Sequence, residues 1–111
     1  MAKFGSFVKM SDEYWTALRD NPSSDRAATV KNAVESVGGK LLFFGFVHGE
    51  YDVLVIAETP THSDYIAVLA KAAFGGMISA MNTFPVVDQD VFTDGFAKMD
   101  KVQYSPQEVK P

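Results

Sequence analysis

The sequence predicts an α+β fold in which one four-stranded antiparallel sheet carries helices on a single face. Two observations lead to this prediction. Residues 41–57 contain two β-prone runs separated by Gly49-Glu50, and a two-residue loop with Gly in first place is typical of a type II′ hairpin. Around this hairpin, strand-like and helix-like patterns follow one another in the order strand, helix, strand, strand, helix, strand.

The two-residue loop sets the register of the hairpin, with His48 opposite Tyr51 beside the turn and Leu42 opposite Ala57 at the far end. Because strand side chains alternate, one face then carries eight side chains: Leu42, Phe44, Phe46, His48, Tyr51, Val53, Val55 and Ala57. The opposite face is also mostly apolar, through Leu41, Phe43, Val47, Leu54 and Ile56. Neither face of the hairpin is therefore suited to contact with water.

The first half of the chain supplies one strand and two helical segments. Residues 3–10 alternate weakly and predict a first strand. Ser11 has the position of an N-cap for a short helix, which Asn21-Pro22 interrupts. A second helical segment runs from Asp25 to the glycine pair at 38–39.

The second half supplies a helix, a strand and a further helix. Residues 65–74 are apolar nearly all round, which predicts a helix buried on more than one side. Residues 77–87 are strand-like, and Asp88 is placed to cap a last short helix with one apolar side, made of Val91, Phe92, Gly95, Phe96 and Met99. We expect residues 1–99 to form a single domain and residues 100–111 an extended C-terminal tail.

This order of elements is typical of a ferredoxin-like βαββαβ domain, with strand order 4-1-3-2 and the helices on one face. The other face of the sheet is then apolar and uncovered. Each large apolar residue left there forgoes about 1.5–3 kcal/mol, against a total stability of about 5–15 kcal/mol for a domain. We therefore expect a second copy of the chain to cover that face, which gives a homodimer built as an α/β barrel.

Composition excludes several functional classes. The chain has 111 residues, 47% of them hydrophobic, and a net charge of −4 without a basic stripe, so we expect a soluble protein with no nucleic-acid partner. The absence of cysteine excludes disulfides and thiolate chemistry and fits a cytoplasmic location. No signal-peptide run and no stretch of roughly 20 apolar residues is present, so we expect no membrane partner.

The hairpin also carries a recognisable motif. Gly49-Glu50-Tyr51-Asp52-Val53, with Val37-Gly38-Gly39-Lys40-Leu41 before it and Ala57-Glu58-Thr59-Pro60 after it, resembles the GYD domain family, which is named for a Gly-x-Tyr-Asp signature. The resemblance extends from about Phe4 to Met99. It implies a ferredoxin-like fold of the dimeric α/β barrel type. It leaves function open, because the family has no established general biochemical activity.

His48, Tyr51 and Asp52 form the densest set of ionisable side chains beside the turn. His48 and Tyr51 share a face, so an imidazole and a phenol can converge on one small ligand, as acid or base and as hydrogen-bond donor. The structural alternative is a cross-strand pair that closes the hairpin, with Asp52 capping backbone groups or pairing with a lysine across the dimer. Both interpretations stay open.

A second candidate region lies between the helices and the sheet. Tyr14 and Trp15 on the first helix, next to a Phe-rich sheet, favour an aromatic-lined cavity for an apolar ligand, and plain core packing is the alternative. We expect no metal, because His48 and His62 are the two histidines and lack a ligand-like spacing. We expect no cofactor either, because no glycine-rich phosphate loop is present.

The sequence thus supports two hypotheses about function. The first is a non-enzymatic homodimeric module that binds a small apolar or aromatic ligand between helices and sheet. The alternative is a small cofactor-independent enzyme, similar to a monooxygenase or an isomerase, with His48 as acid or base and Tyr51 as hydrogen-bond donor. A cavity reached by His48 or Tyr51 would favour the enzyme.

Overall fold

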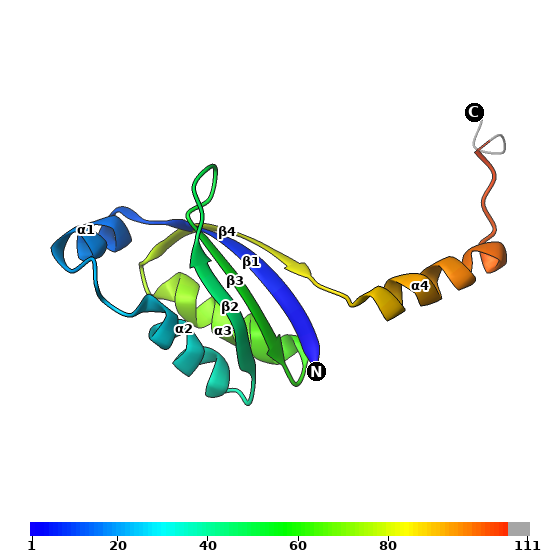
Figure 1. Cartoon of the computed structure of the whole chain (residues 1–111), viewed down its shortest axis with the longest axis horizontal. Coiled ribbons are helices and arrows are strands. Elements are labelled where there is room, and N and C mark those ends of the chain that lie inside the picture. The colour runs from blue at the N-terminus through cyan, green and yellow to red at the C-terminus, as the bar shows by residue number, and fades with distance from the viewer. Residues whose placement is uncertain (107–111) are drawn as a thin grey trace.

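The computed structural model describes residues 1–106, which fold into one antiparallel sheet with helices on one of its faces (Figure 1). In chain order, the elements are β1 (Ala2–Met10), α1 (Asp12–Asp20), α2 (Arg26–Glu35), β2 (Lys40–Phe46), β3 (Val53–Thr59), α3 (His62–Phe74), β4 (Ile78–Pro85), α4 (Gln89–Ala97) and the 3₁₀ helix η1 (Met99–Lys101). The predicted tail, residues 100–111, starts within η1, and its part from 107 to 111 lies outside the described residues.

The strands lie in the order β2-β3-β1-β4, which is the predicted order read from the opposite edge of the sheet. All neighbouring strands are antiparallel. β1 and β3 are therefore central, and β2 and β4 form the two edges. This arrangement confirms the predicted α+β, ferredoxin-like architecture of the single chain.

The core lies between the sheet and helices α2 and α3. Alternate residues of the two central strands are buried on this side: Phe4, Ser6, Val8 and Met10 in β1, and Val53, Val55, Ala57 and Thr59 in β3. Val34 of α2 and Tyr65 of α3 meet them from the helices, with 0% and 2% of their surface exposed. The helices thus cover one face of the sheet, as predicted.

Local signals set most helix boundaries where the sequence predicts them. The side chains of Ser11 and Asp25 cap α1 and α2. A capping box between Thr61 and Asp64 starts α3 three residues ahead of the predicted start at Tyr65. The sequence prediction followed the apolar run and missed this polar first turn.

The hairpin register is right beside the loop and wrong at the far end. A β-bulge at Leu42 pairs Ala57 with Leu41 instead of Leu42. The extra residue reverses which side chain faces the helices, so Leu41 packs on the core while Leu42 is 40% exposed. The predicted placement of Leu42 on the same face as Phe44 and Val55 is therefore wrong.

The predicted two-residue turn is also wrong, because the ladder ends at the last residue of β2 and the first of β3, and residues 47–52 form a loop. Asp52 gives the physical reason. Its backbone N–H donates to the carbonyl of Val8, and its carboxylate accepts from the N–H of Met10, both at 2.9 Å. These bonds fasten the loop to β1, while the Asp52 carbonyl still accepts a hydrogen bond from the N–H of Val47, at 2.9 Å, across the hairpin.

Helix α3 is buried on one side in the single chain. Tyr65 is fully buried, whereas Ile66 and Phe74 are 53% and 91% exposed. Within residues 1–106 no further layer of structure packs outside α3, so the prediction of burial on more than one side is wrong.

Candidate functional site

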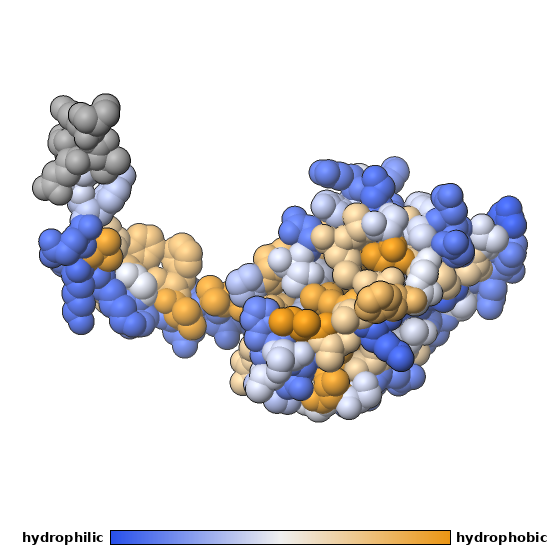
Figure 2. Space-filling model, turned by 180° about the vertical axis from the view of Figure 1, so that it is seen from behind, coloured by the Kyte–Doolittle hydropathy of each residue, from blue (hydrophilic) through white to orange (hydrophobic). Residues whose placement is uncertain are grey.

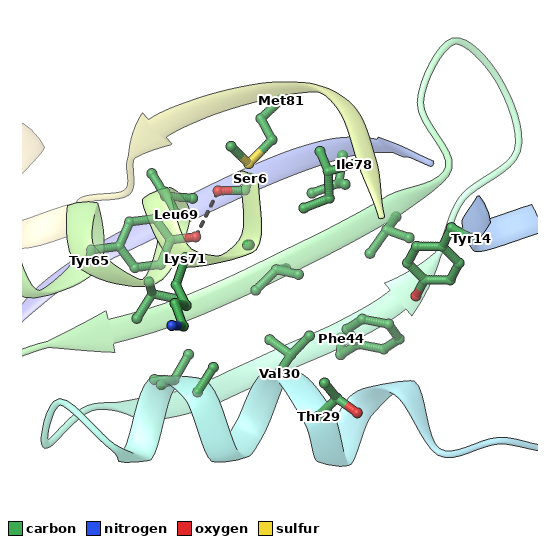
Figure 3. A pocket seen from close by; sticks show the side chains of 17 residues that line it. Ser6, Tyr14, Thr29, Val30, Phe44, Tyr65, Leu69, Lys71, Ile78 and Met81 are labelled. Carbon is green, nitrogen blue, oxygen red and sulfur yellow. Dashed lines mark hydrogen bonds between the residues drawn. The ribbon is translucent and has the colours of Figure 1, made fainter. Parts of the chain in front are cut away.

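A pocket of about 280 Å³ lies on the helix-covered side of the sheet, between α2, α3 and the strands (Figure 3). Its walls are mainly apolar, with contributions from α2 (Val30, Ala33), α3 (Val68, Leu69, Ala72) and the sheet (Phe44, Val53, Val55, Ile78, Met81). Protein interiors normally contain few voids larger than a water molecule, whereas ligand pockets begin at roughly 300 Å³. The volume is therefore close to that of a small ligand site.

Small side chains on the two helices create this space. α2 presents Ala33 to the pocket and α3 presents Ala72, at positions where a leucine side chain would extend into the volume. The turn that follows α2 lies tightly against β3, because a Cβ on Gly39 would lie 2.5 Å from the carbonyl oxygen of Glu58. The space between α2 and the sheet is therefore closed at this end and opens toward Ala33 and Ala72.

One wall of the pocket carries connected hydroxyl groups. Ser6 Oγ lies 2.7 Å from Tyr65 Oη and 2.8 Å from Thr83 Oγ1. Ser6 and Tyr65 both line the pocket, and Figure 3 shows their hydrogen bond as a dashed line. Burial raises the pKa of the Tyr65 phenol, and the hydrogen bond with Ser6 acts in the opposite direction. The phenol is thus protonated at neutral pH and can exchange a hydrogen bond with a ligand.

Tyr14 and Lys71 complete the lining. Tyr14 comes from α1 and is 9% exposed, and burial raises the pKa of its phenol while the Arg26 guanidinium, 5.1 Å from the ring centre, lowers it. Lys71 reaches the pocket from α3 (Figure 3). None of the ion pairs or side-chain hydrogen bonds found in residues 1–106 involves Lys71. The pocket thus has a cationic side chain on one wall.

The structure brings one of the sequence-predicted candidates, Tyr14, into this pocket. Trp15 is 53% exposed and does not line it. His48 is exposed in the loop, and Asp52 bonds the backbone of β1. The hydrogen bond from the Met10 N–H to the Asp52 carboxylate agrees with the interpretation that Asp52 caps backbone groups.

Tyr51 lies on the other side of the sheet from the pocket. Its ring centre is 5.7 Å from that of Phe7, which alternates in β1 with the buried Ser6 and Val8. Tyr51 therefore does not share a face with Val53 and the core, because the loop, and not the hairpin ladder, determines its direction. Neither His48 nor Tyr51 lines the pocket.

Sequence reasoning missed Ser6, Tyr65 and Lys71 as pocket residues. The available signal was their polarity at positions that face the core: Ser6 interrupts the apolar alternation of a strand, and Tyr65 opens the apolar part of an Ala-rich helix. Only the packing of α3 across β1 brings the two hydroxyls within 2.7 Å of each other.

The helix-free side of the sheet, which we call the open face, is an apolar surface. The ring of Phe7 lies between those of Tyr51 and Phe84, with centres 5.7 and 5.8 Å away. Glycines let the aromatic rings lie flat on the strands, since a Cβ on Gly5 would come within 2.5 Å of the Phe84 ring. Three more apolar side chains extend this surface: Phe43, Leu54 and Ile56.

Residues 1–106 contain neither a membrane-spanning helix nor a cluster of metal ligands. No helix there combines the length and apolar character that crossing a membrane requires. No group of three or more His, Asp or Glu side chains in this part of the chain is placed to hold a metal ion.

Comparison with known proteins gives the family. Residues 6–94 match the family model described as GYD domain. The match covers β1 from Ser6 onward, strands β2 to β4, helices α1 to α3 and the first part of α4. The chain belongs to the GYD domain family. The predicted resemblance is thereby confirmed, while a search of curated proteins found no match. Since membership names neither a reaction nor a ligand, the function of this GYD domain has to be inferred from its geometry.

Proposed function

We propose that this GYD domain is a homodimeric module that binds a small apolar or aromatic molecule in the pocket between α2, α3 and the sheet. The volume and apolar lining of the pocket carry the proposal. The lining residues Thr29, Ala33 and Lys71 are exposed, so the pocket opens between α2 and α3 and a ligand can enter it from solvent. An apolar ligand held there removes apolar surface from water, which contributes about 25 cal/mol per Å².

The lining also limits the chemistry of the ligand. Engineered apolar cavities of about 150 Å³ accept benzene, and drug-sized ligands need roughly 300 Å³ or more. A molecule with one or two rings, or a branched aliphatic of similar size, fits between these limits. The Tyr65 and Ser6 hydroxyls can orient one polar group of such a molecule.

Calorimetric titration with indole tests the ligand pocket. We expect saturable binding to the wild-type protein and its loss in the Ala72→Leu variant, because leucine fills volume in the pocket. Ala67→Leu is the matched control, since Ala67 is exposed on the same helix and does not line the pocket. Equal binding by wild type and Ala72→Leu would place the ligand elsewhere and contradict the proposal.

The enzymatic alternative uses His48 and Tyr51, and the same titration examines it. Both side chains lie away from the pocket lining, so we expect His48→Ala and Tyr51→Phe to bind indole as the wild type does. A marked loss of binding in either variant would favour a site at the loop over the site between the helices and the sheet.

The dimer follows from the open face. In the single chain, 49% of the surface of Phe43 is exposed on this face. Full burial of each large apolar residue there would contribute about 1.5–3 kcal/mol. Packing of two open faces about a two-fold axis that runs along the strands covers these residues in both copies. It also sets β4 of one copy beside β2 of the other, which protects the two edge strands of each sheet.

Analytical ultracentrifugation tests the dimer. We expect a dimer for the wild type and a monomer for Ile56→Lys, which buries a charge in the centre of the open face. Ile66→Lys makes the same change on the exposed side of α3 and should remain dimeric. A monomeric wild type at about 100 μM, or a dimeric Ile56→Lys variant, would contradict packing through the open face.

A further inference from the structure

The C-terminal part of the described chain, α4 and η1, projects from the domain, and we call residues 89–101 the arm (Figure 1). Every residue of α4 is exposed. The arm gives the chain a radius of gyration of 18.2 Å, against about 13 Å for a compact chain of this length. Val91 borders the domain, in a hollow that it shares with Ala2 and Phe4, whereas Phe92, Phe96 and Met99 line a groove formed by the arm and Val87.

One side of the arm is apolar. Val91, Phe92, Phe96 and Met99 are 54–62% exposed and line one shallow groove with Gly95, as the helical spacing of these residues predicts. The rings of Phe92 and Phe96 contact each other at 5.2 Å between centres. Figure 2 shows apolar side chains along the projecting arm, with hydrophilic ones beside them.

Such a helix needs a surface to pack on. Isolated helices shorter than about 12–15 residues are marginal in water, and α4 has 9. Gly95 in its interior costs roughly a further 1 kcal/mol relative to alanine. The Asp88 side chain makes no capping hydrogen bond. Helical order in the arm therefore depends on a contact with its apolar side.

The domain that carries the arm offers this contact to Val91 but not to Phe92, Phe96 or Met99. The N–H of Val86 donates to the carbonyl of Lys3, and Lys3 Nζ lies 2.7 Å from Asp88 Oδ1. These two bonds fix the start of the arm beside the first residues of β1, and α4 projects from there away from the sheet (Figure 1).

We infer that the arm docks on the second copy of the chain, with its apolar side on the start of the partner's β2. This inference rests on the proposed dimer. In a dimer with the two-fold axis along the strands, β4 of one copy lies beside β2 of the other. Because β2 and β4 run in opposite directions, the arm leaves β4 where the partner's β2 begins.

That end of β2 has the surface and charge to receive the arm. Leu42 is 40% exposed because of the bulge, and its neighbour Phe43 is 49% exposed. Lys40, the first residue of β2, takes part in none of the ion pairs found in residues 1–106. The arm contains three aspartates and two lysines, a net charge of −1. An exposed apolar patch with a cation beside it thus faces an apolar arm of slight negative charge, and the two-fold axis makes the exchange of arms reciprocal.

Ultracentrifugation of the full chain tests the energetic role of the arm. We expect Phe92→Ser/Phe96→Ser to raise the dissociation constant of the dimer about tenfold or more, because each phenylalanine loses an apolar contact in both arms. Gln89→Ser/Thr93→Ser, which leaves the apolar groove intact, should change it by less than about twofold. An unchanged dissociation constant in the phenylalanine variant, with Ile56→Lys monomeric, would overturn the arm inference and leave the dimer standing.

Cysteine cross-linking tests where the arm docks, and the cysteine-free sequence makes it simple. A Met99→Cys chain mixed with a Leu42→Cys chain should form a disulfide-linked heterodimer on mild oxidation. Met99→Cys mixed with Ile66→Cys should not, since Ile66 lies on the outer side of α3. Absence of the Leu42→Cys product would overturn docking at β2, and a monomeric wild type would overturn the dimer and the arm inference together.

Discussion

Replacing Ala72 by leucine should make the unliganded protein more stable, which is unusual for an enlarged side chain in a core. Ala72 lines the pocket from α3, and leucine adds three carbon atoms. At about 0.8 kcal/mol for each buried CH₂ group, the additional burial is worth about 2.4 kcal/mol if the pocket is empty. The small difference in helix propensity leaves a gain of about 2 kcal/mol, or about 8 °C in Tm for a domain of this size.

Urea denaturation followed by circular dichroism measures this gain, at one fixed protein concentration because of the proposed dimer. The Ala67→Leu control adds the same atoms to the exposed side of α3 and should change the unfolding free energy by no more than about 0.5 kcal/mol. A densely packed site would behave differently, because enlarged side chains there destabilise by about 1–3 kcal/mol. Destabilisation of that size in Ala72→Leu would show that the space is occupied by protein and refute the pocket.

Three further predictions concern single groups. Asp52→Ala should destabilise the fold by about 1–3 kcal/mol, because the Met10 N–H loses its acceptor, and Asp52→Asn should retain most of the stability in the same urea titration. Burial raises the pKa of the Tyr65 phenol above its ordinary 10.0, so protonation of this group stabilises the folded state. This contribution to the unfolding free energy is complete below about pH 10 and is lost as the pH rises through the folded-state pKa. Between about pH 9 and pH 11, urea denaturation should therefore show a smaller loss of unfolding free energy for Tyr65→Phe than for the wild type. Gly76→Ala should lower the unfolding free energy by about 1–2 kcal/mol, because Gly76 has a φ of +79° that a residue with a Cβ adopts only under strain. Gly49→Ala is the control and should be nearly neutral, because Gly49 has a negative φ and no atom within 4 Å of an added Cβ. Equal losses in the two variants would contradict backbone strain as the cause.

Most of the candidate site was beyond the reach of sequence reasoning. Tyr14 was predicted because an aromatic residue on a helix beside a Phe-rich sheet favours an apolar cavity. Ser6 and Tyr65 are 59 residues apart in sequence, and only the docking of α3 on β1 joins their hydroxyls. The prediction for His48 and Tyr51 extends a period of two into a loop, and that extension fails beyond the Val47–Asp52 hydrogen bond, where Asp52 also bonds to β1.

The sequence by itself determined the order of elements, the cap of α1 and the GYD signature, because these depend on neighbouring residues and on a short repeat of side-chain direction. It also predicted the apolar side of α4, since helical spacing alone brings Val91, Phe92 and Phe96 together. Tertiary structure decided the bulge at Leu42, the direction of Tyr51 and the space beside Ala72. Each of these depends on how distant segments pack and pair, and residues close in sequence carry no information on the volume left between two helices and a sheet.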